Sequence, residues 1–212
     1  MQKELTFYLL RHGRTVWNDQ GLMQGSGNSD LTEAGIQGAI LTGKALANVP
    51  FVAAYSSCLQ RTIDTANHIL GQRDVPLFQH NGLNEHAFGS WEGQKIEIIQ
   101  QLDEYQQMLN DPANYQALSN GGETWAELAE RAMKAIYDIA RVHDKGNILI
   151  VSHGNTLRLL MALFNGISWQ KHCEEGNSEH LRNTSINIVR YIQNDNEVKF
   201  IVEKTNDASH LA

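Results

Sequence analysis

The stretch LTFYLLRHG, residues 5–13, decides the fold, because it joins a strand pattern to a histidine placed between an arginine and a glycine. Its first six residues are apolar, aromatic or β-branched, which is typical of a strand buried on both faces. Comparable runs predict further strands at residues 51–55, 147–151, 185–191 and 198–202.

Helical patterns lie between these strands. Thr32 can cap a helix that runs to about Ala47, and residues 59–69 have the pattern of a second helix. The clearest helix follows Thr124, which has capping-box spacing with Glu127. The apolar stripe of that helix comprises Trp125, Leu128, Ala132, Ile136 and Ile139.

The alternation of strands and helices predicts the fold class. We expect an α/β protein, a three-layer α/β/α sandwich with a mixed, mostly parallel sheet. A hairpin between the last two strands, around residues 193–197, supplies the antiparallel element. The segment 94–122 is rich in Gln, Asn and Asp, and we expect it to start with one helix and to pass over a site. A length of 212 residues fits a single domain over residues 1–212.

Composition and charge exclude several classes of protein. The chain is 42% hydrophobic and 19% charged, which is typical of globular rather than disordered proteins. A formal net charge of -7 argues against a nucleic-acid-binding surface. We find no apolar stretch long enough to cross a bilayer and no signal-like N-terminus, so we expect a cytoplasmic protein. Cys58 and Cys173 fit no metal or disulfide spacing and are expected to be reduced thiols that fill space.

The end of the first strand carries the first candidate for chemistry. Ligands of open α/β sheets bind where strands end, because the following loop and helix present free N–H groups to an anion. Arg11 can grip two phosphate oxygens, His12 can present a ring nitrogen to phosphorus, and Gly13 would let the backbone approach. The alternative is that Arg11 and His12 are solvated loop residues.

Two other strand ends repeat this chemistry. Arg61 falls in the first turn of a helix, where a cation opposes the helix dipole unless it serves an anion. His153 and Gly154 follow the strand at 147–151, which reproduces the His-Gly pattern of the first strand. Each of these residues alone has an ordinary structural explanation, but two histidines at equivalent strand ends are harder to dismiss.

A carboxylate completes the set. Glu85 precedes an aromatic, glycine-punctuated loop, and burial there would favour its protonated form, as a general acid requires. His86 competes for this role. Glu92 is a further candidate, although it fits better as a residue that caps the loop.

Together these elements resemble the histidine phosphatase (phosphoglycerate-mutase-like) superfamily, in its small-phosphatase branch. Arg-His-Gly alone is weakly specific, whereas the ordered set is strongly specific. The set spans nearly the whole chain, at residues 11–13, 17–18, 24–25, 30–35, 56–61, 83–93, 121–123 and 152–154.

The resemblance implies a phosphoglycerate-mutase-like fold and a metal-independent phosphohydrolase of the histidine acid phosphatase type, with no cofactor and no metal. By the same resemblance His12 is the nucleophile, Glu85 the proton donor and His153 a second catalytic histidine. The phosphate-binding residues that it implies are Arg11, Arg61, Asn18, Gln24, Gly25 and Gly154. The family commonly has an acidic residue where this chain has Arg14, which we leave unassigned.

The main alternative is a cofactor-dependent phosphoglycerate mutase, whose substrate carries further negative charge. Between Asp74 and Glu130 the only permanent cation is Lys95, which favours a small phosphate ester of a less charged, partly apolar alcohol. A metallohydrolase is disfavoured because arginines beside the histidines repel a cation. A noncatalytic phospho-ligand binding module is the third alternative, and homo-oligomers stay open.

Overall fold

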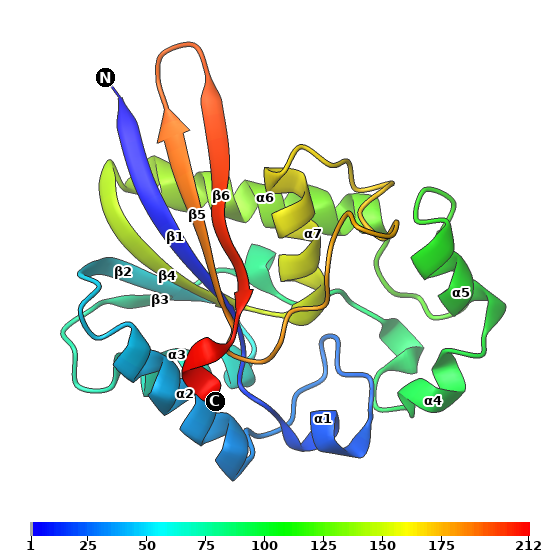
Figure 1. Cartoon of the computed structure of the whole chain (residues 1–212). Helices are drawn as coiled ribbons and strands as arrows, with labels where there is room; N and C mark the ends of the chain where they lie inside the picture. Colours follow the sequence, from blue (N-terminus) through cyan, green and yellow to red (C-terminus); the bar gives the residue numbers. More distant parts are fainter. Residues whose placement is uncertain (1) are drawn as a thin grey trace.

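The computed structural model describes residues 2–212. Its centre is a six-stranded sheet with the order β3-β2-β4-β1-β5-β6 (Figure 1). The first four of these strands pair in parallel, whereas β5 pairs antiparallel with both β1 and β6. This confirms the mixed, mostly parallel sheet. The strand bounds are β1 Lys3–Arg11, β2 Phe51–Ser56, β3 Leu77–Gln79, β4 Lys145–Ser152, β5 Ile186–Gln193 and β6 Val198–Asp207.

Helices cover both faces of the sheet (Figure 1), which confirms the three-layer sandwich. Successive side chains of β1 point to opposite faces, so Phe7 packs beneath α6 and α7 while Leu10 packs beneath α2 and α3. The helix bounds are α1 Val16–Gln20, α2 Glu33–Ala45, α3 Gln60–Leu70, α4 Ile96–Ile99, α5 Asp103–Asn110, α6 Trp125–Val142 and α7 Gly154–Phe164, with 3-10 turns η1 Asn81–Leu83, η2 Gly89–Trp91 and η3 Ser209–Leu211. None of the helices within residues 2–212 is long and apolar enough to span a membrane.

Local signals set the helix starts. The Thr32 hydroxyl accepts a hydrogen bond from Gly35 N at 3.0 Å, which caps α2. Thr124 and Glu127 form the expected capping box at the start of α6. All five residues of the predicted α6 stripe are buried.

Three predictions need correction. Strand β3 is missing from the sequence analysis because three residues at a sheet edge are too few to show a periodic pattern. The segment 94–122 holds two helices, α4 and α5, instead of one, and packs over a core that includes Met108 and Trp125. Cys58 is exposed and does not fill space, whereas Cys173 is half-buried.

Candidate active site

Three of the predicted site elements meet at the carboxyl-terminal ends of the parallel strands. In the parallel pair β1–β4, Arg11 pairs with Ser152, so His12 and His153 follow at the same level. Strand β2 lies on the other side of β4 and leads into α3, which carries Arg61 in its first turn. The strand register therefore brings together residues that are far apart in the sequence.

His12 is buried directly after β1. Its Nδ1 lies 2.7 Å from the carbonyl oxygen of Gly13. A carbonyl only accepts, so Nδ1 carries the hydrogen and Nε2 keeps its lone pair. Burial lowers the pKa of His12 well below 6.5, and the positive charges of Arg11 and Arg61 lower it further. The neutral imidazole has the form that a nucleophile needs.

His153 lies against His12, with ring centroids 5.3 Å apart and an interplanar angle of 61°. Its Nε2 is 2.8 Å from the hydroxyl of Ser57, and its Nδ1 is buried with no partner among the described residues. Burial lowers the pKa of His153 well below 6.5, with the charge of Arg61 next in importance. If the Ser57 hydroxyl donates to Nε2, then Nδ1 carries a hydrogen and can donate a hydrogen bond to a bound ligand.

Arg11 and Arg61 are anchored by backbone carbonyls. Arg11 Nη1 donates to Leu181 O at 2.9 Å, and Arg61 Nη2 donates to Gly25 O at 2.7 Å. The Nε of each arginine is buried without a partner within residues 2–212. Burial lowers the pKa of Arg61 to about 10, so its guanidinium stays charged at neutral pH.

Glu85 reaches the site from the segment after η1, where it meets the N-terminus of α7. Its Oε1 accepts from His86 N at 2.8 Å and from Thr156 N at 3.0 Å, and its Oε2 accepts from Asn155 N at 3.1 Å. The side chain is half-buried and held by backbone N–H groups. The first turn of α7 therefore supplies two of the three donors, which the sequence pattern did not predict.

His86 and Glu92, the other candidates for the acid, have structural partners. His86 is buried among aromatic rings and its Nε2 donates to Glu123 O at 2.6 Å. Glu92 accepts from Ser26 N at 2.9 Å and from Phe88 N at 3.0 Å, which joins two loops. Burial lowers the pKa of His86, so the ring is neutral.

A cavity of about 190 Å³ opens over these residues. Glu85 is the only acidic residue among the described residues that line it. Predicted residues in the lining are Arg11, His12, Asn18, Gln24, Gly25, Arg61 and Glu85, whereas the predicted His153 is absent from it and packs against His12. The lining also includes residues that the sequence analysis did not assign, namely Leu22, Met23, Phe88, Ile96, Tyr105, Met108, Leu109, Asn155 and His180.

Two glycines of the site pack closely against neighbouring residues. A Cβ on Gly13 would lie 2.7 Å from Gly35 O, so the expected close approach of the backbone is to α2. Gly13 N donates to the Thr65 hydroxyl at 2.9 Å. Gly154 is absent from the described cavity lining and lies behind Arg11, whose Nε would be 3.3 Å from an added Cβ.

Arg14 and Gln24 show how the neighbouring loops are fixed. The Arg14 side chain is exposed and forms an ion pair with Asp19. Gln24 is buried, and its Oε1 accepts from the hydroxyls of Thr15 at 3.1 Å and Ser29 at 3.2 Å. Gln24 therefore anchors the loop that brings Gly25 to the cavity.

The fold and this set of residues agree with a match to a known family. The model of the histidine phosphatase superfamily (branch 1) matches residues 7–204. The chain therefore belongs to the histidine phosphatase superfamily, as an enzyme of the phosphoglycerate mutase family.

Individual relatives include both phosphatases and mutases. The chain is 30% identical over 217 residues to a metal-independent phosphoserine phosphatase of Arabidopsis thaliana, which covers 100% of this chain and 86% of that protein. It is 37% identical over 171 residues to a 2,3-bisphosphoglycerate-dependent phosphoglycerate mutase of Bartonella quintana, which covers 77% of this chain and 82% of the mutase. The solved structure of Bacillus stearothermophilus YhfR matches with a TM-score of 0.87 and 33% identity, covering 98% of this chain and 100% of that one.

Proposed function

We propose that the chain is a metal-independent phosphomonoester hydrolase that acts through a phosphohistidine on His12. One observation carries this proposal. Buried polar atoms of proteins are nearly always paired, yet Arg11 Nε, Arg61 Nε and His153 Nδ1 have no partner among the described residues. Arg11 and Arg61 line the cavity, and the neutral His153 packs against His12, which also lines it. Two cationic donors and a neutral imidazole suit an anion with several acceptor oxygens, and they disfavour a bound metal cation.

In the first step the phosphoryl group passes from the substrate alcohol to His12. Arg11 and Arg61 neutralise the charge on the phosphoryl oxygens and hold phosphorus in line with Nε2 of His12. The lone pair of Nε2 forms the N–P bond while the P–O bond to the alcohol breaks. Protonated Glu85 gives its proton to the departing alcohol oxygen. The products of this step are the free alcohol, phosphohistidine and ionised Glu85.

In the second step water replaces the alcohol. Ionised Glu85 takes a proton from the water as its oxygen attacks phosphorus, and the N–P bond breaks. The electron pair of that bond returns to Nε2, which restores neutral His12 and releases inorganic phosphate. His153 donates to the phosphoryl oxygens in both steps, since their charge changes in each transition state.

The cavity wall supports a partly apolar alcohol as the leaving group. Leu22, Ile96 and Tyr105 line the cavity from the loop and helices that cover the site. Lys95, the only permanent cation between residues 74 and 130, donates to Gln20 O at 2.8 Å and is absent from the described lining. This arrangement favours a monoester over the more highly charged substrates of a mutase. A small phosphorylated metabolite is the proposed partner, while a cytoplasmic location and a homo-oligomer stay predictions.

Hydrolysis of para-nitrophenyl phosphate in excess EDTA tests this function, with the parent and His12→Ala compared. We expect activity in the chelator and a loss of at least about 10³-fold in the variant. A rapid quench of the parent, followed by intact-mass analysis, should show one phosphoryl group that is labile to acid. His143→Gln is the matched control, because His143 lies outside the cavity lining and its Nε2 meets the Tyr55 hydroxyl at 2.7 Å.

The outcomes separate the alternatives. Activity that requires an added metal ion would contradict the proposal. Phosphotransfer that proceeds only with a bisphosphate would indicate a mutase. Binding of phosphate esters without a single turnover would indicate a noncatalytic module.

A further inference from the structure

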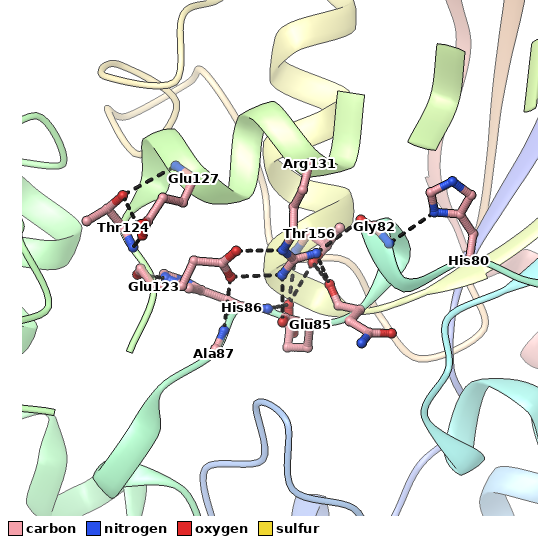
Figure 2. Close-up of polar contacts among 11 residues, drawn as sticks. His80, Gly82, Glu85, His86, Ala87, Glu123, Thr124, Glu127, Arg131 and Thr156 are labelled. Carbon is pink, nitrogen blue, oxygen red and sulfur yellow. Dashed lines mark hydrogen bonds and ion pairs between the residues drawn. The ribbon is translucent and has the colours of Figure 1, made fainter. Parts of the chain in front are cut away.

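Arg131 of α6 holds the chain segment that carries Glu85, as Figure 2 shows. Its Nη1 donates to Gly82 O at 3.0 Å and to Asn84 O at 2.8 Å. Its Nη2 donates to Glu85 O at 2.9 Å. One guanidinium group therefore binds three carbonyl oxygens in the four residues 82–85, which fixes the path of this turn.

Glu123 orients the guanidinium from the opposite side. Its two carboxylate oxygens accept from Arg131 Nε at 2.5 Å and from Arg131 Nη2 at 2.8 Å, a two-point contact that fixes the plane of the group (Figure 2). Glu123 also accepts from Ala87 N at 3.2 Å and, through its carbonyl, from His86 Nε2 at 2.6 Å. The Arg131–Glu123 pair thus clamps the backbone on both sides of Glu85.

Helix α7 completes the clamp. Asn84 O, which accepts from Arg131, also accepts from the Thr156 hydroxyl at 2.8 Å. The same hydroxyl lies 3.1 Å from Glu85 Oε1. The Glu85 backbone is therefore set by α6, and its carboxylate is set by α7. A shift of that backbone would move the carboxylate relative to His12.

We propose that Arg131 is a positioning residue for the general acid, which it aligns through the Glu85 backbone. This proposal rests on the proposed function, in which Glu85 protonates the leaving alcohol. Arg131 is absent from the described cavity lining, so it acts through Glu85 rather than on the substrate. Proton transfer needs close alignment, and a displacement of about 1 Å can cost about 10²-fold in rate.

Leaving groups distinguish positioning from general support of the fold. A simple alkyl phosphate needs protonation of its leaving oxygen, whereas para-nitrophenyl phosphate has a stable leaving anion and needs little. We expect Arg131→Gln to lower kcat for the alkyl ester by about 10- to 100-fold. We expect kcat for the nitrophenyl ester to stay within about threefold of the parent, with KM for both esters little changed. Arg131→Lys should restore part of the alkyl activity.

A double variant supplies the deciding comparison. In a Glu85→Gln background the acid is gone, so Arg131→Gln should cause no further loss with the alkyl ester. Glu123→Gln disturbs the orientation of Arg131 while keeping its side chain, so it should lower kcat for the alkyl ester selectively, but by less than Arg131→Gln. It replaces Arg131→Gln in this test if that variant does not fold. Arg141→Gln is the matched control, because Arg141 is an exposed arginine of the same helix, paired with Asp138.

Each outcome has one meaning. Equal losses on both esters in both the Arg131 and Glu123 variants, or losses that add to that of Glu85→Gln, would overturn the positioning role. A Glu85→Gln variant as active as the parent on the alkyl ester would instead remove Glu85 as the acid, and with it that part of the proposed function. A selective loss that vanishes in the Glu85→Gln background would establish the positioning role.

Discussion

The rings of His12 and His153 lie 5.3 Å apart and are tilted by 61°. They occupy equivalent positions on two parallel strands, because Arg11 pairs with Ser152 in the sheet. Burial lowers the pKa of each ring, which favours the neutral form of both. Two neutral rings avoid mutual charge repulsion, which fits the roles proposed for His12 as the nucleophile and His153 as a hydrogen-bond donor.

The lowered pKa of His12 makes a prediction about its titration. A depressed pKa means that the neutral, nucleophilic form persists as the pH falls below 6.5. Histidine NMR signals of the resting enzyme should therefore show His12 still neutral near pH 6. In Arg61→Gln the pKa of His12 should rise, because one of the charges that lower it is gone. A His12 that titrates at or above 6.5 in the parent would contradict this account.

The burial of His172 predicts how stability depends on pH. Burial lowers its pKa to about 4, below the value of 6.5 in the unfolded chain. The unfolded state therefore binds more protons between these values, and the free energy of unfolding should decrease as pH falls from 6.5 to 4. Urea unfolding at several pH values checks this. His172→Phe should show a shallower slope over that interval, whereas an unchanged slope would exclude His172 as a contributor.

Loss of the Arg61 guanidinium should weaken transition-state binding. We expect Arg61→Gln to lose about 2 to 4 kcal/mol of transition-state stabilisation, comparable with removal of a strong preorganised donor, which lowers kcat/KM by about 30- to 900-fold. Arg61→Lys should recover only part of this, since an ammonium group keeps the charge but not the planar fork. Initial rates with para-nitrophenyl phosphate measure the effect. An unchanged kcat/KM in Arg61→Gln would exclude a role for Arg61 in binding the phosphoryl group.

The apolar wall predicts substrate preference. We expect phenyl phosphate to be hydrolysed with a higher kcat/KM than phosphoglycerate. Ile96→Arg should narrow that difference by about tenfold, because it adds a cation at the cavity. Ile98→Arg is the matched control, since Ile98 is 60% exposed and absent from the described lining. An equal change in both variants would indicate a general effect of net charge.

Close packing of α2 against the loop after β1 predicts an asymmetry between two glycines. A Cβ on Gly35 would lie 2.1 Å from Arg14 O, whereas one on Gly38 would come no closer than 3.2 Å to the Thr184 hydroxyl. Gly35→Ala should lower the free energy of unfolding by about 1 to 3 kcal/mol or more. Gly38→Ala should change the free energy of unfolding little, because the preference of a helix for Ala over Gly offsets the tight contact of the new Cβ. Urea unfolding of both variants decides this, and equal stabilities would contradict the packing argument.

Much of the fold was predictable because its signals are local. The run from Leu5 to Leu10 predicts a strand, and Thr124 with Glu127 predicts the start of a helix. The structure confirms both. The short edge strand β3 and the split into α4 and α5 escaped prediction, because short elements form mainly through their neighbours.

The sequence by itself determined the superfamily and which side chains are candidates for the site. The strand ends, the capping residues and the His-Gly pairs are local motifs, each formed by residues that are close in the sequence. Only the tertiary structure decided what Glu85, His86 and Arg131 do. Whether Glu85 meets the α7 N-terminus, whether His86 turns toward Glu123, and whether Arg131 reaches the Glu85 backbone all depend on segments distant in sequence. Hydrogen bonds between side chains and distant backbone act over a few ångströms, so their partners are fixed only when the sheet and helices have packed.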